Sequence, residues 1–148
     1  MRPRLLLIEP DPAFRLGAIA ALRDAFDVQV PDRPDDILRL ARAQRPDVAL
    51  FAAGDHQRRE AVRLARVLKT DVRMVPALGL YTHAGQRGPS AAAVADVGAD
   101  GFLHDVDAPG ALFAFALALA RGEKPLPHPW PEGRHSGLRK LLTRIAGR

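Results

Sequence analysis

Apolar and polar residues along the chain form two alternating kinds of pattern. Five short segments rich in apolar residues are predicted to be strands, and the continuous run at residues 4–9 is typical of a strand buried on both faces of a parallel sheet. The five apolar runs are residues 4–9, 26–30, 48–53, 72–81 and 101–104. After each run comes a segment whose apolar residues recur at helical spacing. These segments are residues 12–25, 34–45, 56–69, 90–98 and 107–121.

Strands that alternate with helices predict a parallel sheet covered on both faces. We therefore expect an α/β domain with a doubly wound, five-stranded sheet of flavodoxin-like order 2-1-3-4-5 and five flanking helices. Functional groups in such sheets gather beyond the carboxyl ends of the strands, where the strand order reverses. Those positions are Glu9, Ala52, Ala53, Tyr81 and Thr82.

Local signals mark several helix ends. Asp11 precedes a proline, so its carboxylate is predicted to cap the first helix. Asp55 is predicted to cap the third helix in the same way. Ser90 is predicted to begin the fourth helix, and Gly98 is predicted to end it.

The C-terminal part of the chain differs from the rest. Residues 1–121 are predicted to form the body, and residues 122–134, with four prolines, a linker. Residues 135–148 are predicted to form a short basic amphipathic helix that needs a surface to dock on. Its predicted contact residues are Leu138, Arg139, Lys140, Leu141, Leu142, Arg144 and Ile145. Trp130, in the linker, is predicted to anchor that segment on the body.

Most of the net charge of +5 lies in this C-terminal part. Residues 1–121 carry 16 basic and 15 acidic side chains, whereas residues 122–148, the tail, carry 6 and 2. A basic tail can meet nucleic acid, an acidic protein surface or anionic lipid, or can serve solubility alone. An arginine-rich band at Arg58, Arg59, Arg63 and Arg66 is predicted to be a solvated outer face of the third helix.

Other features of the composition exclude some classes of function. The chain has no cysteine, which excludes disulfides and thiolate metal sites and fits a cytoplasmic protein. No apolar run approaches the ~20 residues of a membrane-spanning helix. The five histidines form no metal-binding motif, and neither a phosphate-binding loop nor a Ser-His-Asp order is present.

Three segments resemble a known family. LLLIEPDPAFR, RPDVALFAA and VGADGFLHD occur in the order and on the strands expected of a bacterial response-regulator receiver domain (CheY-like). The resemblance covers about residues 4–121. It implies a role in signal transduction, and in the family a phosphorelay passes phosphate to an aspartate on the third strand.

The residues at the corresponding positions depart from the family pattern. Glu9 matches the first acid of the metal-binding pair, but Pro10 stands at the second acid and Ala52 at the phosphorylated aspartate. Asp105 stands at the lysine, and the hydroxyl position falls on Tyr81 or Thr82.

Phosphoryl transfer needs a nucleophilic carboxylate and a Mg²⁺ ion held by acids. The sequence therefore predicts a degenerate pseudo-receiver that is not an enzyme and has no metal or other cofactor. Two alternatives stay open at this point. Asp55 could accept phosphate in place of Ala52, and Glu9, Asp11 and Asp105 together could hold a cation.

Three phenylalanines are candidates for a switch or an interface. Phe102 matches the aromatic switch of the family, and we expect its ring to pack in the core or in a partner face. Phe113 and Phe115 are two positions apart on the last helix, so they cannot share one face. One is expected in the core. The other is a candidate for a homodimer contact through the face of the fourth helix, fifth strand and fifth helix.

The favoured function is a phosphorylation-independent module that binds a protein partner or a second copy of itself. One alternative is an atypical transcriptional regulator whose basic tail makes weak contacts with nucleic acid. A second is an active receiver phosphorylated at a non-standard acid. A third is a sensor that binds a small molecule in the space left by Ala52.

Overall fold

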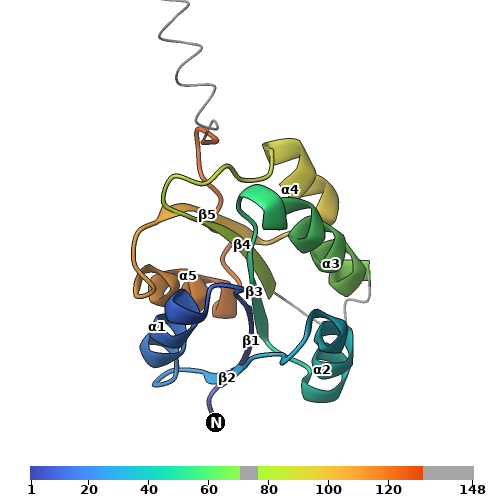
Figure 1. The fold of residues 1–148 in the computed structure, drawn as a ribbon, viewed down its shortest axis with the longest axis vertical. Coiled ribbons are helices and arrows are strands. Elements are labelled where there is room, and N and C mark those ends of the chain that lie inside the picture. The colour runs from blue at the N-terminus through green and yellow to red at the C-terminus, as the bar shows by residue number, and fades with distance from the viewer. Residues whose placement is uncertain (71–76, 132–148) are drawn as a thin grey trace, which may run out of the picture.

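The computed structural model describes residues 1–70 and 77–131, in which five parallel strands form one sheet of order β2-β1-β3-β4-β5 (Figure 1). The strands are β1 Arg4–Ile8, β2 Asp27–Gln29, β3 Val48–Ala52, β4 Ala77–His83 and β5 Gly101–Val106. The helices are α1 Pro12–Leu22, α2 Ile37–Gln44, α3 Arg58–Thr70, α4 Ala91–Val97 and α5 Ala111–Ala120. Single 3₁₀ turns, Pro34–Asp36 and Asp55–Gln57, precede α2 and α3. The predicted flavodoxin-like fold is confirmed.

The helices cover the sheet in two layers. Helices α1 and α5 lie on one face, and α2, α3 and α4 lie on the other (Figure 1). Side chains of β1 alternate between the two layers, as in any strand. Leu5 and Leu7 pack beside α1 and α5, and Leu6 packs on the opposite side. All five residues of β3 are buried, as expected of a central strand.

The predicted capping residues Asp11, Ser90 and Gly98 are confirmed. The Asp11 carboxylate accepts hydrogen bonds from the amides of Ala13 and Phe14 at 3.0 and 3.3 Å. Ser90 caps α4 through the amide of Ala93, and α4 ends at Gly98 with a left-handed φ of 78°.

The predicted capping role of Asp55 is wrong. Gly54 is the residue before the 3₁₀ turn, and Asp55 has a left-handed φ of 50°. The Asp55 carboxylate accepts a 2.8 Å hydrogen bond from the amide of Arg87, and the Asp55 amide donates to the Arg87 carbonyl at 2.7 Å. Asp55 therefore fastens the β4–α4 loop to the start of α3.

Several element bounds differ from those predicted. Strand β4 ends at His83, two residues later than expected, and residues 71–76, which include its predicted beginning, lie outside the described residues. Strand β5 continues to Val106 after a shift of its register with β4. Helix α1 stops at Leu22 because the next residues turn tightly, with the amide of Phe26 bonded to the Leu22 carbonyl.

The first part of the linker lies against the body. The amide of Phe102, on the edge strand β5, donates to the Pro125 carbonyl at 2.9 Å. The Trp130 ring stacks on the Phe102 ring with centroids 4.9 Å apart. The predicted C-terminal helix and its contact residues, in residues 135–148, fall outside the described residues. No helix within residues 1–70 and 77–131 is long and apolar enough to cross a membrane.

Candidate functional site

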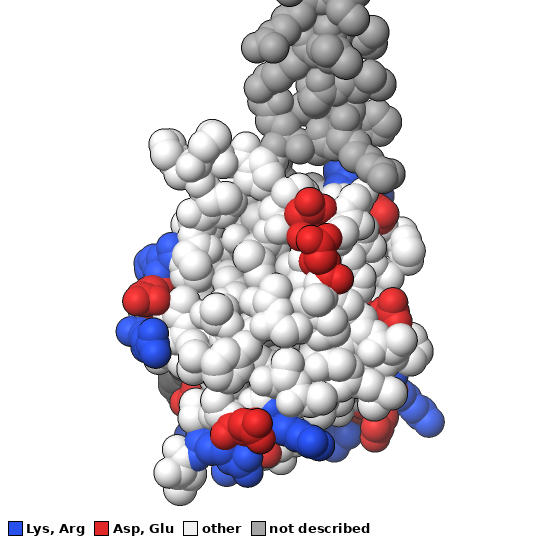
Figure 2. Space-filling view, turned by 90° about the vertical axis from the view of Figure 1, so that its left-hand side faces the viewer, with Lys and Arg blue, Asp and Glu red and all other residues white. Residues whose placement is uncertain are grey.

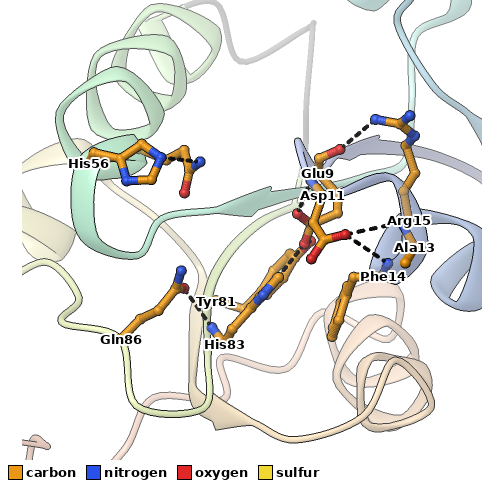
Figure 3. Close-up of polar contacts among 10 residues, drawn as sticks. Glu9, Asp11, Ala13, Phe14, Arg15, His56, Tyr81, His83 and Gln86 are labelled. Carbon is orange, nitrogen blue, oxygen red and sulfur yellow. Dashed lines mark hydrogen bonds and ion pairs between the residues drawn. The ribbon is translucent and has the colours of Figure 1, made fainter.

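A buried carboxylate lies at the carboxyl end of β1. Glu9 is 4% exposed, and its Oε1 accepts hydrogen bonds from the Tyr81 hydroxyl at 2.8 Å and from Nε2 of His83 at 2.5 Å. Its Oε2 accepts the amide of Asp11 at 2.9 Å. Figure 3 shows the two β4 side chains pointing toward Glu9. Both carboxylate oxygens are therefore engaged by groups of the protein itself.

The sheet register explains how these side chains meet. Strand β3 lies between β1 and β4, with Ile8 paired to Phe51 and Ala52 paired to Tyr81. Side chains of Ala52 and Tyr81 face the same layer, beside α1 and α5. Neighbouring strands are about 5 Å apart, so the long tyrosine side chain can span β3 and reach Glu9. Ala52 leaves room for this because it contributes only a methyl group.

Aromatic packing holds the pair of β4 side chains in place. Tyr81 and His83 are two residues apart, so they share one face of the strand. The Phe14 ring, from α1, stacks on the His83 ring with centroids 4.1 Å apart and an interplanar angle of 24°. Gln86 accepts the amide hydrogen of His83 at 2.9 Å, and Arg15 donates to the Glu9 carbonyl at 2.9 Å.

The electrostatics of the site favour a neutral tyrosine. Burial raises the pKa of Tyr81 well above its ordinary value, and the charge and hydrogen bond of Glu9 raise it further. The phenol therefore keeps its proton at neutral pH and acts as a hydrogen-bond donor to the carboxylate.

The other predicted site residues make contacts within the fold. Thr82 faces the opposite layer from Tyr81, and its Oγ1 accepts the amide of Asp105 at 3.0 Å and lies 3.1 Å from Nδ1 of His104. The Asp105 carboxylate accepts the amide of Gly85 at 2.8 Å, and Asp105 has a left-handed φ of 63°. Asp105 therefore holds the loop after β4.

These residues do not fit a Mg²⁺ ion, which needs several free oxygen ligands. Both oxygens of Glu9 already accept hydrogen bonds, Pro10 and Ala52 offer no side-chain ligand, and Asp11 caps α1. The alternative of a cation held by Glu9, Asp11 and Asp105 is not supported, because these three side chains do not come together. Across the two described stretches, no three histidine, aspartate or glutamate side chains come together as a metal-binding group.

A cavity of about 240 Å³ opens beside this site at the carboxyl ends of β1 and β3. Its walls are mostly apolar and include Pro10, Ile37, Phe51, Ala52 and Leu64. The apolar walls suit an apolar group, and the charged residues Arg15, Asp32, Arg33 and Glu60 also line the space.

The three phenylalanines have different environments. Phe102 is 3% exposed and packs in the core, where the Trp130 ring stacks on it, and Phe115, on the buried face of α5, is 5% exposed. Phe113 is half-buried at the edge of the same cluster.

His83, Phe14 and Gln86 were not predicted as site residues. The signal for His83 was present, because residues two apart on a strand face the same way and Glu9 ends a neighbouring strand. Phe14 and Gln86 could not be found in this way, since their contacts depend on how α1 and the β4–α4 loop pack.

Comparisons with known proteins place the fold. The sheet order and the two helix layers define a flavodoxin-like α/β protein, and several solved structures that match it are response regulators. No family model matches the chain, and no curated protein matches it.

A response regulator protein from Burkholderia multivorans is similar, with 23% identity, a TM-score of 0.60 and coverage of 81% of this chain and 96% of that chain. A LuxR family DNA-binding response regulator from Silicibacter pomeroyi has 23% identity and a TM-score of 0.65, covering 86% and 99%. The isolated REC domain of RcsB from Salmonella enterica serovar Typhimurium, solved with phosphomimetic BeF3-, has 15% identity and a TM-score of 0.66, covering 86% and 94%. The chain therefore has the fold of a response-regulator receiver domain.

Proposed function

We propose that this protein is a receiver-like binding module of bacterial signal transduction that works without being phosphorylated. The observation that carries the proposal is the hydrogen bond between Tyr81 and Glu9, made across the methyl group of Ala52. Chemistry at this edge of the sheet would need a nucleophile at position 52 and a free carboxylate at position 9. The first is an alanine, and the second is satisfied by two side chains and an amide.

The same contacts support a role outside catalysis. A fully hydrogen-bonded buried carboxylate stabilises one arrangement of the loops around it. We infer that Glu9, Tyr81 and His83 hold the receiver fold in a single conformation, so that binding does not depend on a phosphorylation signal. The module needs no cofactor for this.

A surface without charge is the best candidate for contact with a protein partner. Helix α5 contains no charged residue, and Arg15 is the only one in α1. Figure 2 shows, on the side of the molecule where these helices lie, a broad area without acidic or basic side chains, with a cluster of acidic side chains above it and mixed charges below it. Leu16, on α1, is 70% exposed. Surfaces depleted in charge and bearing an exposed large apolar side chain are typical of protein contacts.

Self-association through α4, β5 and α5 remains a prediction. The linker lies along β5, where Pro125 accepts the amide hydrogen of Phe102. A second copy that used this surface would have to share it with the linker.

Phosphorylation can be tested directly. The full chain, incubated with acetyl phosphate and Mg²⁺, should give no phosphoprotein by intact mass, while an active receiver treated in parallel becomes modified. An Asp55→Asn variant is the matched control for the remaining acid near β3. A stoichiometric, hydroxylamine-labile phosphate that is lost in Asp55→Asn would refute the proposal and establish the unorthodox receiver instead.

The partner surface has its own test. A protein captured on the immobilised chain, once identified, should be lost in a Leu16→Glu variant. It should be kept in Leu126→Glu, since Leu126 is also exposed, at 46%, but lies in the linker. Equal capture by both variants would place the contact elsewhere.

A further inference from the structure

Five arginines line a groove between α3 and α4. Four of them belong to α3, and the fifth, Arg87, comes from the β4–α4 loop. Trp130, from the linker, lines the same groove, whose volume is about 630 Å³. The α3 arginines are Arg58, Arg59, Arg63 and Arg66. The sequence predicts only a solvated helix face here, whereas folding adds a fifth guanidinium and an indole from distant parts of the chain.

Several contacts fix the walls of this groove. Arg87 is placed by its two backbone hydrogen bonds to Asp55, at 2.7 and 2.8 Å. Near the other end of α3, Lys69 forms a 3.0 Å ion pair with Asp100, and both side chains are largely buried. Trp130 is held by its stacking on Phe102. The groove is therefore built in advance, which lowers the entropic cost of binding a ligand.

The charge within the groove is of one sign. No aspartate or glutamate of the described residues lines it. Arg63 and Arg66 pair with Glu60 and Asp96 outside the lining, but all four side chains are more than half exposed, and such pairs are weak. The other three arginines make no ion pair within residues 1–70 and 77–131. A concave surface of this kind concentrates anions.

We propose that this groove binds single-stranded nucleic acid, with the arginines on the phosphates and Trp130 stacked against a base. Guanidinium groups match phosphate oxygens in a bidentate geometry and also stack on bases, and all the cations in the groove are arginines. A half-buried indole beside a line of positive charge is the pairing by which proteins bind single strands without sequence preference. The carboxylates of an acidic peptide would satisfy the arginines but would bring no flat ring to stack on the indole.

The binding test uses the full chain and its intrinsic fluorescence. Trp130 is the only tryptophan, so quenching of its emission reports a base stacked on the indole. Unstructured oligothymidine and oligouridine are the two probes, which separate DNA from RNA, and polyglutamate is the probe for an acidic peptide. Either oligonucleotide should quench the Trp130 emission. In a second measurement, the fluorescence anisotropy of a dye-labelled oligonucleotide should rise when the protein is added.

Matched variants separate the groove from the basic tail. Arg58→Ala/Arg59→Ala/Arg87→Ala removes three positive charges from the groove. A control triple, Arg23→Ala/Arg42→Ala/Arg121→Ala, removes three from exposed arginines elsewhere and leaves the tail unchanged. The groove triple should bind about tenfold more weakly or worse than the wild type. The slope of log K against log salt concentration should be less steep by about 2.

Variants of the indole test the stacking itself. Trp130→Leu should lose about 5-fold to 100-fold in affinity, whereas Trp130→Phe should regain part of that loss because it restores an aromatic face. Quenching of the Trp130 emission by an added oligonucleotide is the readout that a purely structural role in packing on Phe102 would not produce. The proposal is overturned if the two arginine triples bind equally, if the emission is not quenched by either oligonucleotide, or if polyglutamate binds as tightly as they do.

Discussion

Replacing Tyr81 by phenylalanine isolates one hydrogen bond of the buried site. The substitution keeps the ring and its packing and removes only the hydroxyl, which donates to Glu9 at 2.8 Å. Both residues are buried, at 0% and 4% exposure, so water cannot replace the lost donor. Hydrogen bonds to charged groups contribute about 1.5–3 kcal/mol. Because Glu9 keeps His83 and the Asp11 amide, we expect a loss of about 2 kcal/mol, or about 6 °C in Tm.

The pH dependence of this loss has a definite sign. Tyrosine in an unfolded chain ionises near pH ~10, whereas burial and Glu9 raise the pKa of Tyr81 in the folded protein well above that value. The stabilising contribution is therefore fully present below pH ~10. Above it the unfolded chain releases a proton that the folded chain keeps, so stability falls by up to about 1.4 kcal/mol per pH unit. The difference between the wild type and Tyr81→Phe should shrink in that range.

Two measurements check the reasoning. Urea unfolding at neutral pH and above pH ~10 gives the two differences in free energy. Because the chain contains one tyrosine, the absorbance of tyrosinate titrates Tyr81 alone. A loss below about 0.5 kcal/mol, together with titration at the ordinary value near ~10, would show that Tyr81 does not hold Glu9 in solution.

Other substitutions test the fold around the site by urea denaturation. Asp11→Ala should lower the free energy of unfolding by about 1 kcal/mol, because it removes the cap of α1. Gly79→Ala should cost about 1–3 kcal/mol, since a Cβ there would lie 2.7 Å from side chains of α5, whereas Gly110→Ala meets nothing within 4 Å and serves as the control. Ala52→Asp should cost about 3 kcal/mol or more by placing a second carboxylate beside buried Glu9, and part of the loss should be recovered on acidification.

The fold was predictable because short segments of the sequence indicate their own strands and helix ends. The apolar run of β3 is buried along its whole length, and the capping residues Asp11 and Ser90 sit where the helices begin. The prediction for Asp55 failed because a capping residue type also forms turns, and here the left-handed backbone directs it to the β4–α4 loop. The sequence could not indicate that loop as its partner.

The candidate site was predictable only in part. Counting residues along the predicted strands placed Glu9 and Ala52 at the carboxyl ends of β1 and β3, where they lie in the structure. The hydrogen bonds to the Glu9 carboxylate depend on the sheet register. That register turns Tyr81 toward Glu9 and Thr82 toward the other layer. The arginine-lined groove was hidden for a similar reason, since Arg87 and Trp130 join the α3 arginines only after folding.

The position of the linker affects how this protein should be shortened for study. An uncovered strand at the rim of a sheet presents free amide and carbonyl groups that recruit strands of other molecules. Residues 123–131 cover that rim at β5 through the bond from Phe102 to Pro125 and the ring of Trp130. Cutting the chain after Arg121 would bare it, so a fragment of residues 1–121 should aggregate where one of residues 1–131 stays monodisperse.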